Sequence, residues 1–370
     1  MVAVQTATLK HRPRTRKAVE QLSSMARRLG PEGRLPTVVE LRDHLGVSMR
    51  TLNDALGELE SQQVIYRKAG VGIYVAPNAG QRAIALVCDP MFFRSNGASP
   101  FWHMLIDQAK SRAETHDEAL NLHFSSIVGG EVKLPEAVTR DIAAGRVNGM
   151  LFVGGTEDGV TEIENCGVPV VVFAGPGPHV VRIDMDALLM MGVESLAQQG
   201  ARQIAIWTPG DCWISEEAEA RIRTLLATKY QADLWTGPDQ TNQFKITAGP
   251  RQERISRQEA GYNAAMAAFR QPCETWPDGI IVADDTLTLG VLSALQLLGV
   301  AVGTDVKVAS HSNQGIATLI GWQDRITILE VDPNLIVTEM FALLERLMGG
   351  EELAPAEHCV PPLIKVNGHS

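Results

Sequence analysis

A short polar run near the N-terminus has the side-chain types that read DNA bases. It consists of Ser48, Met49, Arg50, Thr51 and Asn53. Arg50 can address guanine and Asn53 can address adenine, because their donors and acceptors match the edges of those bases in the major groove. The hydroxyls of Ser48 and Thr51 suit phosphates or bases. The run therefore predicts a segment that contacts DNA.

A second group of side chains could bind a small polar ligand. Its members are Phe101, Trp102, Trp213, Arg221, Arg223 and Asp285. Carboxylates and guanidinium groups offer paired acceptors and donors to vicinal hydroxyls, and aromatic rings cover the apolar face of a sugar. A plainer interpretation stays open for each residue type. Asp284 or Asp285 would then cap a helix, the arginines would lie on a solvated face and the tryptophans would belong to the core.

Three amphipathic helices and a hairpin must position the DNA-reading residues. Apolar residues recur at helical spacing over 14–29, and Thr37 and Ser48 are good N-caps for two further short helices. Two β-rich runs then flank a glycine-rich turn. This order predicts a winged helix-turn-helix over residues 1–77. The wing residues expected to lie near DNA are Lys68, Gly70 and Gly72.

The N-terminal segment resembles the GntR family of bacterial regulators over about residues 14–76. The resemblance is carried by Arg34–Leu41, Leu45–Leu59 and Gly70–Val75. The DNA contacts that it implies come from Arg34, Thr37, Arg50, Thr51 and Gly70. The family commonly has arginines at positions that are here Val39, Met49 and Asn53. We therefore expect fewer guanine contacts and infer no operator sequence.

Beyond a linker at 78–80, apolar strands alternate with amphipathic helices to the end of the chain. Such alternation predicts parallel sheets covered by helices on both faces, and the length favours two lobes with a cleft between them. Ligands in such folds bind beyond the carboxyl ends of the strands. The predicted fold is therefore an α+β winged helix-turn-helix followed by a two-lobed α/β domain.

Residues 81–366 resemble the effector-binding domain of LacI/GalR regulators, which has the fold of periplasmic sugar-binding proteins. The matching segments are Val181–Asp184, Ile280–Gly290, Ile326–Pro333 and Pro361–Val366. The resemblance makes Asp285 the effector-binding aspartate and Arg223 the arginine, with Arg221 as the fallback register. It places lobe 1 at about 81–183 and 312–331, and lobe 2 at about 184–311 and 332–370.

Two positions depart from the pattern of the LacI/GalR family. Leu226 replaces the glycine that follows the arginine, and Ser312 replaces the usual aspartate after a strand. These departures put a standard hexose or pentose effector in question. They leave the fold assignment unchanged.

Charge is divided unevenly between the two parts of the chain. The formal charge of −10 would argue against nucleic-acid binding. Residues 1–77, however, carry 12 Lys and Arg against 7 Asp and Glu, a net of +5, which leaves 21 against 36, or −15, for residues 78–370. The basic part is the one that the motifs assign to DNA.

Several classes of protein and site are excluded by the sequence. No apolar run approaches the roughly 18–20 residues of a membrane helix, and the N-terminus lacks an apolar signal core, so we expect a cytoplasmic protein without membrane association. The five widely spaced cysteines and nine histidines form no disulfide framework or zinc motif. We therefore expect no metal and no cofactor.

The sequence as a whole predicts a bacterial transcriptional regulator that is not an enzyme. We expect a homodimer on a near-palindromic operator, most simply a repressor of a carbohydrate operon relieved by a sugar-like effector in the cleft. A ligand-responsive activator, or a corepressor-dependent regulator that senses a non-sugar metabolite, stays open. A GntR-headed enzyme fusion is a weaker alternative, because we find no motif of a pyridoxal enzyme, a G-x-S-x-G hydrolase or a P-loop.

Overall fold

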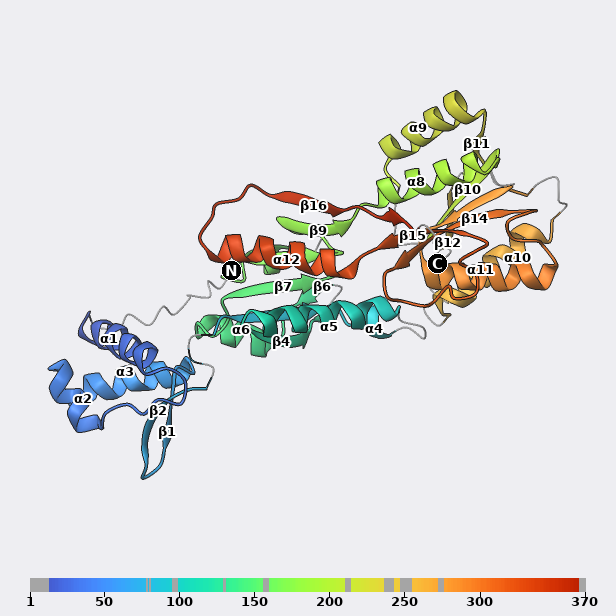
Figure 1. Cartoon of the computed structure of the whole chain (residues 1–370). Coiled ribbons are helices and arrows are strands. Elements are labelled where there is room, and N and C mark those ends of the chain that lie inside the picture. The colour runs from blue at the N-terminus through green and yellow to red at the C-terminus, as the bar shows by residue number, and fades with distance from the viewer. Residues whose placement is uncertain are drawn as a thin grey trace.

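The computed structural model describes residues 13–77, 79, 81–94, 99–128, 131–155, 160–209, 214–235, 243–246, 255–271 and 276–365. It divides into a small N-terminal domain, here called the head (13–77), and a larger body (81–365). In Figure 1 the head lies beside the first lobe of the body and away from the second. Among the described residues, no helix combines the length and the apolar character needed to cross a membrane.

The head has the predicted winged helix-turn-helix fold. Its elements are α1 (Pro13–Leu29), α2 (Val38–Leu45), α3 (Met49–Ser61), β1 (Ile65–Lys68) and β2 (Gly72–Val75). Thr37 caps α2 in a capping box with Glu40, and Gly46 ends it in the left-handed conformation at φ 63°. Ser48 then caps α3. These local signals fix the angle at which α3 leaves α2, and one apolar core of all three helices and both strands holds it.

Lobe 1 of the body is a six-stranded parallel sheet with helices on both faces. Its strands, in the order β16-β9-β8-β7-β3-β4, are Ala356–Val360, His179–Ile183, Val170–Phe173, Gly149–Val153, Ala83–Cys88 and Ala119–Phe124. Its helices are α4 (Met91–Arg94), α5 (Pro100–Thr115), α6 (Glu136–Ala143), α7 (Val160–Glu164) and α12 (Pro333–Met348). A short hairpin, β5 (Ser126–Val128) with β6 (Glu131–Lys133), follows β4. Alternate residues of β3 enter different cores, so both faces of this sheet are buried.

Lobe 2 repeats this plan with a second sheet. The strands, in the order β11-β10-β13-β14-β15-β17, are Asp233–Leu234, Gln203–Pro209, Gly279–Val282, Lys307–Asn313, Thr327–Val331 and Leu363–Ile364, and β12 (Gln243–Ile246) also pairs with β10. Only β17 is antiparallel to its neighbour among these described strands. The helices are α8 (Met185–Gln198), α9 (Glu216–Leu225), α10 (Arg257–Phe269) and α11 (Asp285–Leu298), with a π-helical turn at Leu226–Tyr230. Helix α8 packs on one face of the sheet, and α10 and α11 pack on the other.

The predicted assignment of the C-terminal segments to the two lobes is wrong for most of 312–360, whereas β17 pairs with β15 in lobe 2 as expected. We expected 312–331 in lobe 1 and 332–370 in lobe 2, but β15 pairs with β14 in lobe 2, whereas α12 packs on α5 and β16 pairs with β9 in lobe 1. The chain therefore crosses between the lobes at 184, at 332 and at 361–362. Sheet pairing between distant segments leaves no local trace in sequence, which is why the pattern of strands and helices did not locate these crossings.

A hydrogen bond between described residues joins the head to the body. Arg146, which follows α6 in lobe 1, donates from Nη1 to the backbone carbonyl oxygen of Ser61 at 2.7 Å. Ser61 is the last residue of α3. The same guanidinium is held by an ion pair to Asp141 at the end of α6, so its position is fixed from the body side. A movement of this part of lobe 1 would therefore displace the C-terminal end of α3.

Helices α10 and α11 approach each other closely enough to require glycine. A Cβ atom at Gly290 would collide with the carbonyl oxygen of Gln258, and one at Gly261 would collide with that of Leu287. The two helices pack backbone against backbone and support the start of α11, where Asp285 lies.

This packing predicts opposite effects for two glycine-to-alanine changes. Gly290→Ala should destabilise the body by at least about 1–3 kcal/mol, because the helices must separate. Gly57→Ala should stabilise the head by about 0.5–1 kcal/mol, because nothing lies near its Cβ position and alanine favours helix. Calorimetric unfolding of the full-length variants checks both values. A Gly290→Ala protein as stable as the parent would show that the helices are not in backbone contact.

Candidate functional site

The first turn of α3 carries the side chains predicted to read DNA, and the structure divides them into two groups. Met49, Arg50 and Asn53 are exposed, and none of them has a hydrogen-bond or ion-pair partner among the described residues. Ser48 Oγ instead accepts from the backbone N–H of Thr51 at 3.2 Å, and the two hydroxyl oxygens lie 2.9 Å apart. The exposed group is thus available to base edges, while the hydroxyls fix the start of the helix.

Arg34 and Thr37, also predicted to contact DNA, have structural partners within the head. Arg34 Nη2 donates to the carbonyl oxygen of Val71 at 2.8 Å, and its guanidinium lies against Gly72. Arg34 therefore ties the segment before α2 to the wing. Thr37 Oγ1 donates to Glu40 Oε2 at 2.8 Å in the capping box. Arg34 thus holds the wing against the start of α2, and Thr37 fixes the first turn of α2.

The wing presents a lysine supported by two aromatic rings. Lys68 Nζ lies 5.4 Å from the ring centre of Tyr66 and 5.1 Å from that of Tyr74, within the range of cation–π attraction. Gly70 has φ 71° at the tip. The charge of Lys68 is thereby held beside a tip that has no side chain, a shape that suits contact with a phosphate backbone.

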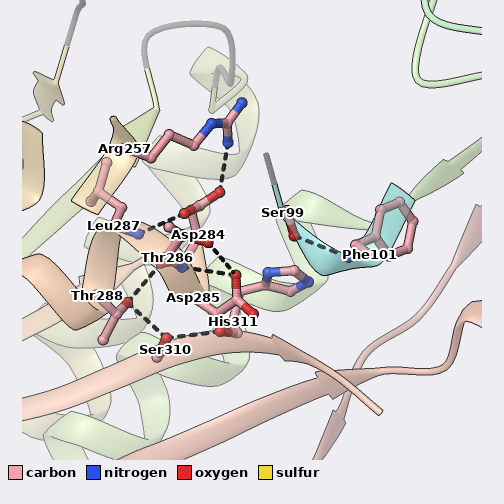
Figure 2. Close-up of polar contacts among 10 residues, drawn as sticks. All are labelled: Ser99, Phe101, Arg257, Asp284, Asp285, Thr286, Leu287, Thr288, Ser310 and His311. Carbon is pink, nitrogen blue, oxygen red and sulfur yellow. Dashed lines mark hydrogen bonds and ion pairs between the residues drawn. The ribbon is translucent and has the colours of Figure 1, made fainter. Parts of the chain in front are cut away.

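Two adjacent carboxylates occupy the start of α11, and they have different partners. Asp284 caps the helix: Oδ1 accepts from the N–H of Leu287 at 2.7 Å, and Oδ2 accepts from Arg257 Nη1 at 2.6 Å (Figure 2). Asp285 is 1% exposed, and its Oδ1 accepts from the N–H of Thr286 at 2.8 Å. Its Oδ2 is buried without a hydrogen-bond partner among the described residues. Asp284 is therefore the structural cap, and Asp285 retains one open acceptor.

A hydroxyl pair links α11 to β14 below these carboxylates. Thr288 Oγ1 donates to the carbonyl oxygen of Asp284 at 2.7 Å and lies 2.8 Å from Ser310 Oγ. Ser310 Oγ donates to the carbonyl oxygen of His311 at 2.8 Å. Figure 2 shows the imidazole of His311 beside the carboxylate of Asp285, on the side toward Ser99 and Phe101. The buried hydroxyls thus fix His311 next to Asp285.

Burial shifts both ionisable groups of this pair toward their neutral forms. Burial, followed by repulsion from Asp284, raises the pKa of Asp285 above its ordinary value of 3.8. The nearby imidazole, the side chain of Thr318 and the hydrogen bond from the N–H of Thr286 oppose that rise. Burial likewise lowers the pKa of His311 below its ordinary value of 6.5. The two groups form a buried pair whose charges a bound molecule could change.

The two candidate arginines lie apart from Asp285. Arg223 pairs with Glu219 on its own helix and with Asp233, which begins β11 at the amino end of the sheet. Asp285 lies at the carboxyl end of the same sheet, so the structure separates these two residues. Arg221 is exposed and lines a surface pocket between α8 and α9 with Asp184 and other residues. Neither arginine is brought to the carboxylates.

The aromatic candidates belong to a cluster at the carboxyl end of the lobe 1 strands. Phe101 is 5% exposed, and its ring centre lies 5.8 Å from that of Phe173. Trp102 is partly buried and stacks on Phe92 with ring centres 4.0 Å apart. Phe101 is thus a core residue, whereas Trp102 keeps an accessible part. Trp213 lies outside the described residues.

Three polar residues near Asp285 were not singled out from the sequence. Arg257 was not predicted because its partner Asp284 lies 27 residues away in the chain. His311 and Asn313 flank Ser312, the position at which the family resemblance directed attention. Strand alternation could have found them, since neighbours of a strand residue lie on the opposite face.

The two parts of the chain match two known domain families. Residues 16–75 match the model of the bacterial regulatory proteins of the gntR family, and residues 193–370 match a periplasmic binding protein-like domain. The histidine utilization repressor of Pseudomonas aeruginosa is 33% identical over 138 residues, which cover 36% of this chain. The match spans 47% of that repressor, so about half of its length is represented. The chain thus joins a segment similar to the gntR family to a segment similar to periplasmic binding protein-like domains.

Solved structures support the fold of the whole chain. The lac repressor bound to ONPG in the repressed state has a TM-score of 0.55 at 17% identity and covers 86% of this chain and 89% of its own. The lac repressor dimer bound to operator and the anti-inducer ONPF gives 0.53 at 18%, covering 77% and 93%. A periplasmic binding protein/LacI transcriptional regulator from Alkaliphilus metalliredigens complexed with D-xylulofuranose gives 0.53 at 16%, covering 77% and 98%. The two-lobed fold predicted from the LacI resemblance is confirmed.

The raised pKa of Asp285 predicts a pH-dependent gain in stability for Asp285→Asn. A group whose pKa is raised by folding stabilises the native state only while it is protonated, and that contribution is lost as pH rises through the folded pKa. At pH 7 the variant should be more stable by about 1–3 kcal/mol, because it removes a buried negative charge and the repulsion between that charge and Asp284. The advantage should shrink toward pH 3.8. Thermal unfolding of the parent and the variant at neutral and acidic pH measures the difference in stability. A difference that does not change with pH would contradict the raised pKa of Asp285.

Proposed function

We propose that this chain is a ligand-responsive transcriptional regulator, most simply a repressor. One arrangement supports the proposal: a helix with exposed, unpartnered Arg50 and Asn53 shares a chain with a buried carboxylate, Asp285, that keeps an open acceptor at the carboxyl edge of a parallel sheet. The first feature suits base reading, and the second suits a small ligand. The domain architecture is that of bacterial regulators, and the relative from Pseudomonas aeruginosa is named a repressor. No catalytic role is proposed for either feature.

The effector would occupy the carboxyl edge of lobe 2 at Asp285 and change how the lobes close. The chain crosses between the lobes three times, at 184, 332 and 361–362, so closure can bend all three crossings together. The head is joined to lobe 1 through the segment before β3 and through the Arg146–Ser61 hydrogen bond. Closure would therefore turn lobe 1, and lobe 1 would carry the head with it.

In a homodimer, this movement would change the separation of the two heads on the operator. Two heads that read half-sites of a near-palindrome must keep a fixed separation, one helical turn of DNA or a multiple of it. A rotation of each body changes that separation and so releases or grips the DNA. The dimeric lac repressor bound to operator supports this assembly by its fold likeness. The protein would act in the cytoplasm, where its operator is.

The proposed position of the effector at Asp285 is better supported than its chemical class. A sugar-like molecule is favoured by the carboxylate, the partly accessible Trp102 and the fold neighbour complexed with D-xylulofuranose. A non-sugar metabolite is the second candidate. It would act as an inducer or as a corepressor, and the protein would be an activator or a repressor. The observations that favour it are Ser312 in place of an aspartate and the engagement of Arg223 by Glu219 and Asp233.

The DNA-reading role predicts that Arg50→Ala weakens operator binding. Losing one bidentate base contact costs about 1–3 kcal/mol, or roughly 5- to 150-fold in affinity. Fragments selected by the parent protein from random DNA supply the operator, and fluorescence anisotropy measures affinity. Arg28→Ala, an exposed arginine at the end of α1, is the matched control and should change affinity less than about twofold. Equal affinities for parent and Arg50→Ala would remove Arg50 from the interface.

The effector role predicts that Asp285→Ala uncouples DNA binding from ligand. The full-length protein is screened by thermal shift against sugars, sugar alcohols, sugar acids and nucleosides, because a ligand that binds only the folded state raises its midpoint. A compound that raises the midpoint should also change operator affinity in the parent. In Asp285→Ala it should do neither, while operator affinity without ligand stays unchanged. A variant that still responds to the compound would refute the site.

A further inference from the structure

Three side-chain atoms at the carboxyl edge of lobe 2 are buried without a hydrogen-bond partner among the described residues. They are Oδ2 of Asp285, Nε2 of His311 and Oδ1 of Asn313. Asp285 and Asn313 are each 1% exposed. Buried polar atoms are normally paired, so a group of them that the fold leaves open needs an explanation. A ligand that completes their hydrogen bonds is such an explanation.

Strand alternation places His311 and Asn313 on one face of β14. Ala309 enters the core shared with α8, whereas Val308 enters the core under α10 and α11. His311 and Asn313 follow Ala309 at steps of two and therefore face the α8 side. Ser312 falls on the opposite face with Ser310, whose hydroxyl bonds to Thr288 on α11. The position expected to hold an aspartate thus points away from this group, and its two neighbours point toward it.

Lobe 1 closes over the same region. Immediately after β14, a Cβ at Gly315 would lie 3.2 Å from Cε of Met104 on α5. Ile316 packs against an apolar cluster that has residues of both lobes, Phe101 among them. Figure 2 shows the ring of His311 between Asp285 and the start of α5 at Ser99. The three atoms therefore lie where the lobes meet, at the place proposed for the effector.

The charges around the group restrict what it can bind. Asp285 adds a carboxylate next to that of Asp284, and the nearby guanidinium of Arg257 is already paired with Asp284. Buried His311 stays neutral near pH 7, because burial lowers its pKa. Both carboxylate and amide oxygens accept hydrogen bonds. An entering anion would meet acceptors and negative charge, whereas a donor group would satisfy them.

We propose that Asp285, His311 and Asn313 form the specificity-determining end of the effector site and select a group that donates hydrogen bonds and carries no negative charge. A hydroxyl and an ammonium share this chemistry. The proposal rests on the proposed function, since it assigns the selectivity of that same site. His311 and Asn313 take the role that Ser312 cannot fill from the opposite face of the strand.

The first test measures the stability of the full-length protein without ligand. Asn313→Leu replaces a buried amide, whose Oδ1 has no partner among the described residues, by an apolar side chain of similar size and should raise the unfolding temperature, as should His311→Phe. Ser310→Ala, on the same strand, removes a hydroxyl that has partners and should lower it. Loss of stability in Asn313→Leu as large as in Ser310→Ala would show that Asn313 is structural and would overturn the proposal.

The second test compares matched ligands by thermal shift. Glucose, glucosamine and glucuronate form one set, and galactose, galactosamine and galacturonate form another. We expect stabilisation by a neutral or an amino member but not by an acid, and a midpoint concentration about tenfold higher in Asn313→Leu, the effect of one lost hydrogen bond. A response to the amino sugar alone identifies an ammonium, and a response to both identifies a hydroxyl.

Two outcomes of the ligand test separate this proposal from the proposed function. If a sugar acid stabilises the parent protein but not Asp285→Ala, the selection of donor groups is overturned. The assignment of the effector site to Asp285 is then still supported. Stabilisation by a neutral or amino sugar that is unchanged in both Asn313→Leu and His311→Phe would overturn the role of these residues. If no member of either set raises the midpoint, the stability of Asn313→Leu relative to Ser310→Ala decides the proposal.

Discussion

The body of this protein depends on a division of roles between two adjacent carboxylates. Helix α11 begins directly after β13 and needs a cap for its free N–H groups. Asp284 supplies that cap and also binds Arg257, so the structural requirements of the helix start are met by one side chain. Asp285 is thereby released from a capping role, yet it is held in place by the same turn and keeps one acceptor open. Rigid support and an open binding atom are obtained at the same point of the sheet.

The packing around this point preserves its geometry. Gly261 and Gly290 let α10 and α11 meet backbone to backbone, and the Thr288–Ser310 contact ties α11 to β14. Side chains on the first turn of α11 and the end of β14 therefore cannot shift independently. A ligand bound at this point would act by moving whole lobes, because the parts that surround it are fixed to one another.

Local signals explain how much of the structure was predictable from sequence. Thr37, Gly46 and Ser48 determine the helix ends of the head through contacts within a few residues, and their consequences could be read directly. The alternation of strands and helices likewise indicated the parallel sheets. The lobe assignment of most of 312–360 was wrong because it depends on pairing between distant strands. Arg223 was expected near Asp285, but its ion pairs with Glu219 and Asp233 were not weighed from the sequence. The open atoms of His311 and Asn313 become visible only when every neighbour is placed.

The hydrogen bond between Arg146 and Ser61 has a consequence for how such chains arise. The body contributes a side chain, but the head contributes only a backbone carbonyl, which every residue type possesses. This hydrogen bond therefore requires a helix end at the right place and no particular residue there. A different winged helix that ended its third helix at the same point could be joined to this body and still accept the hydrogen bond from Arg146. A junction of this kind permits recombination of DNA-binding and sensing modules without matched changes on both sides.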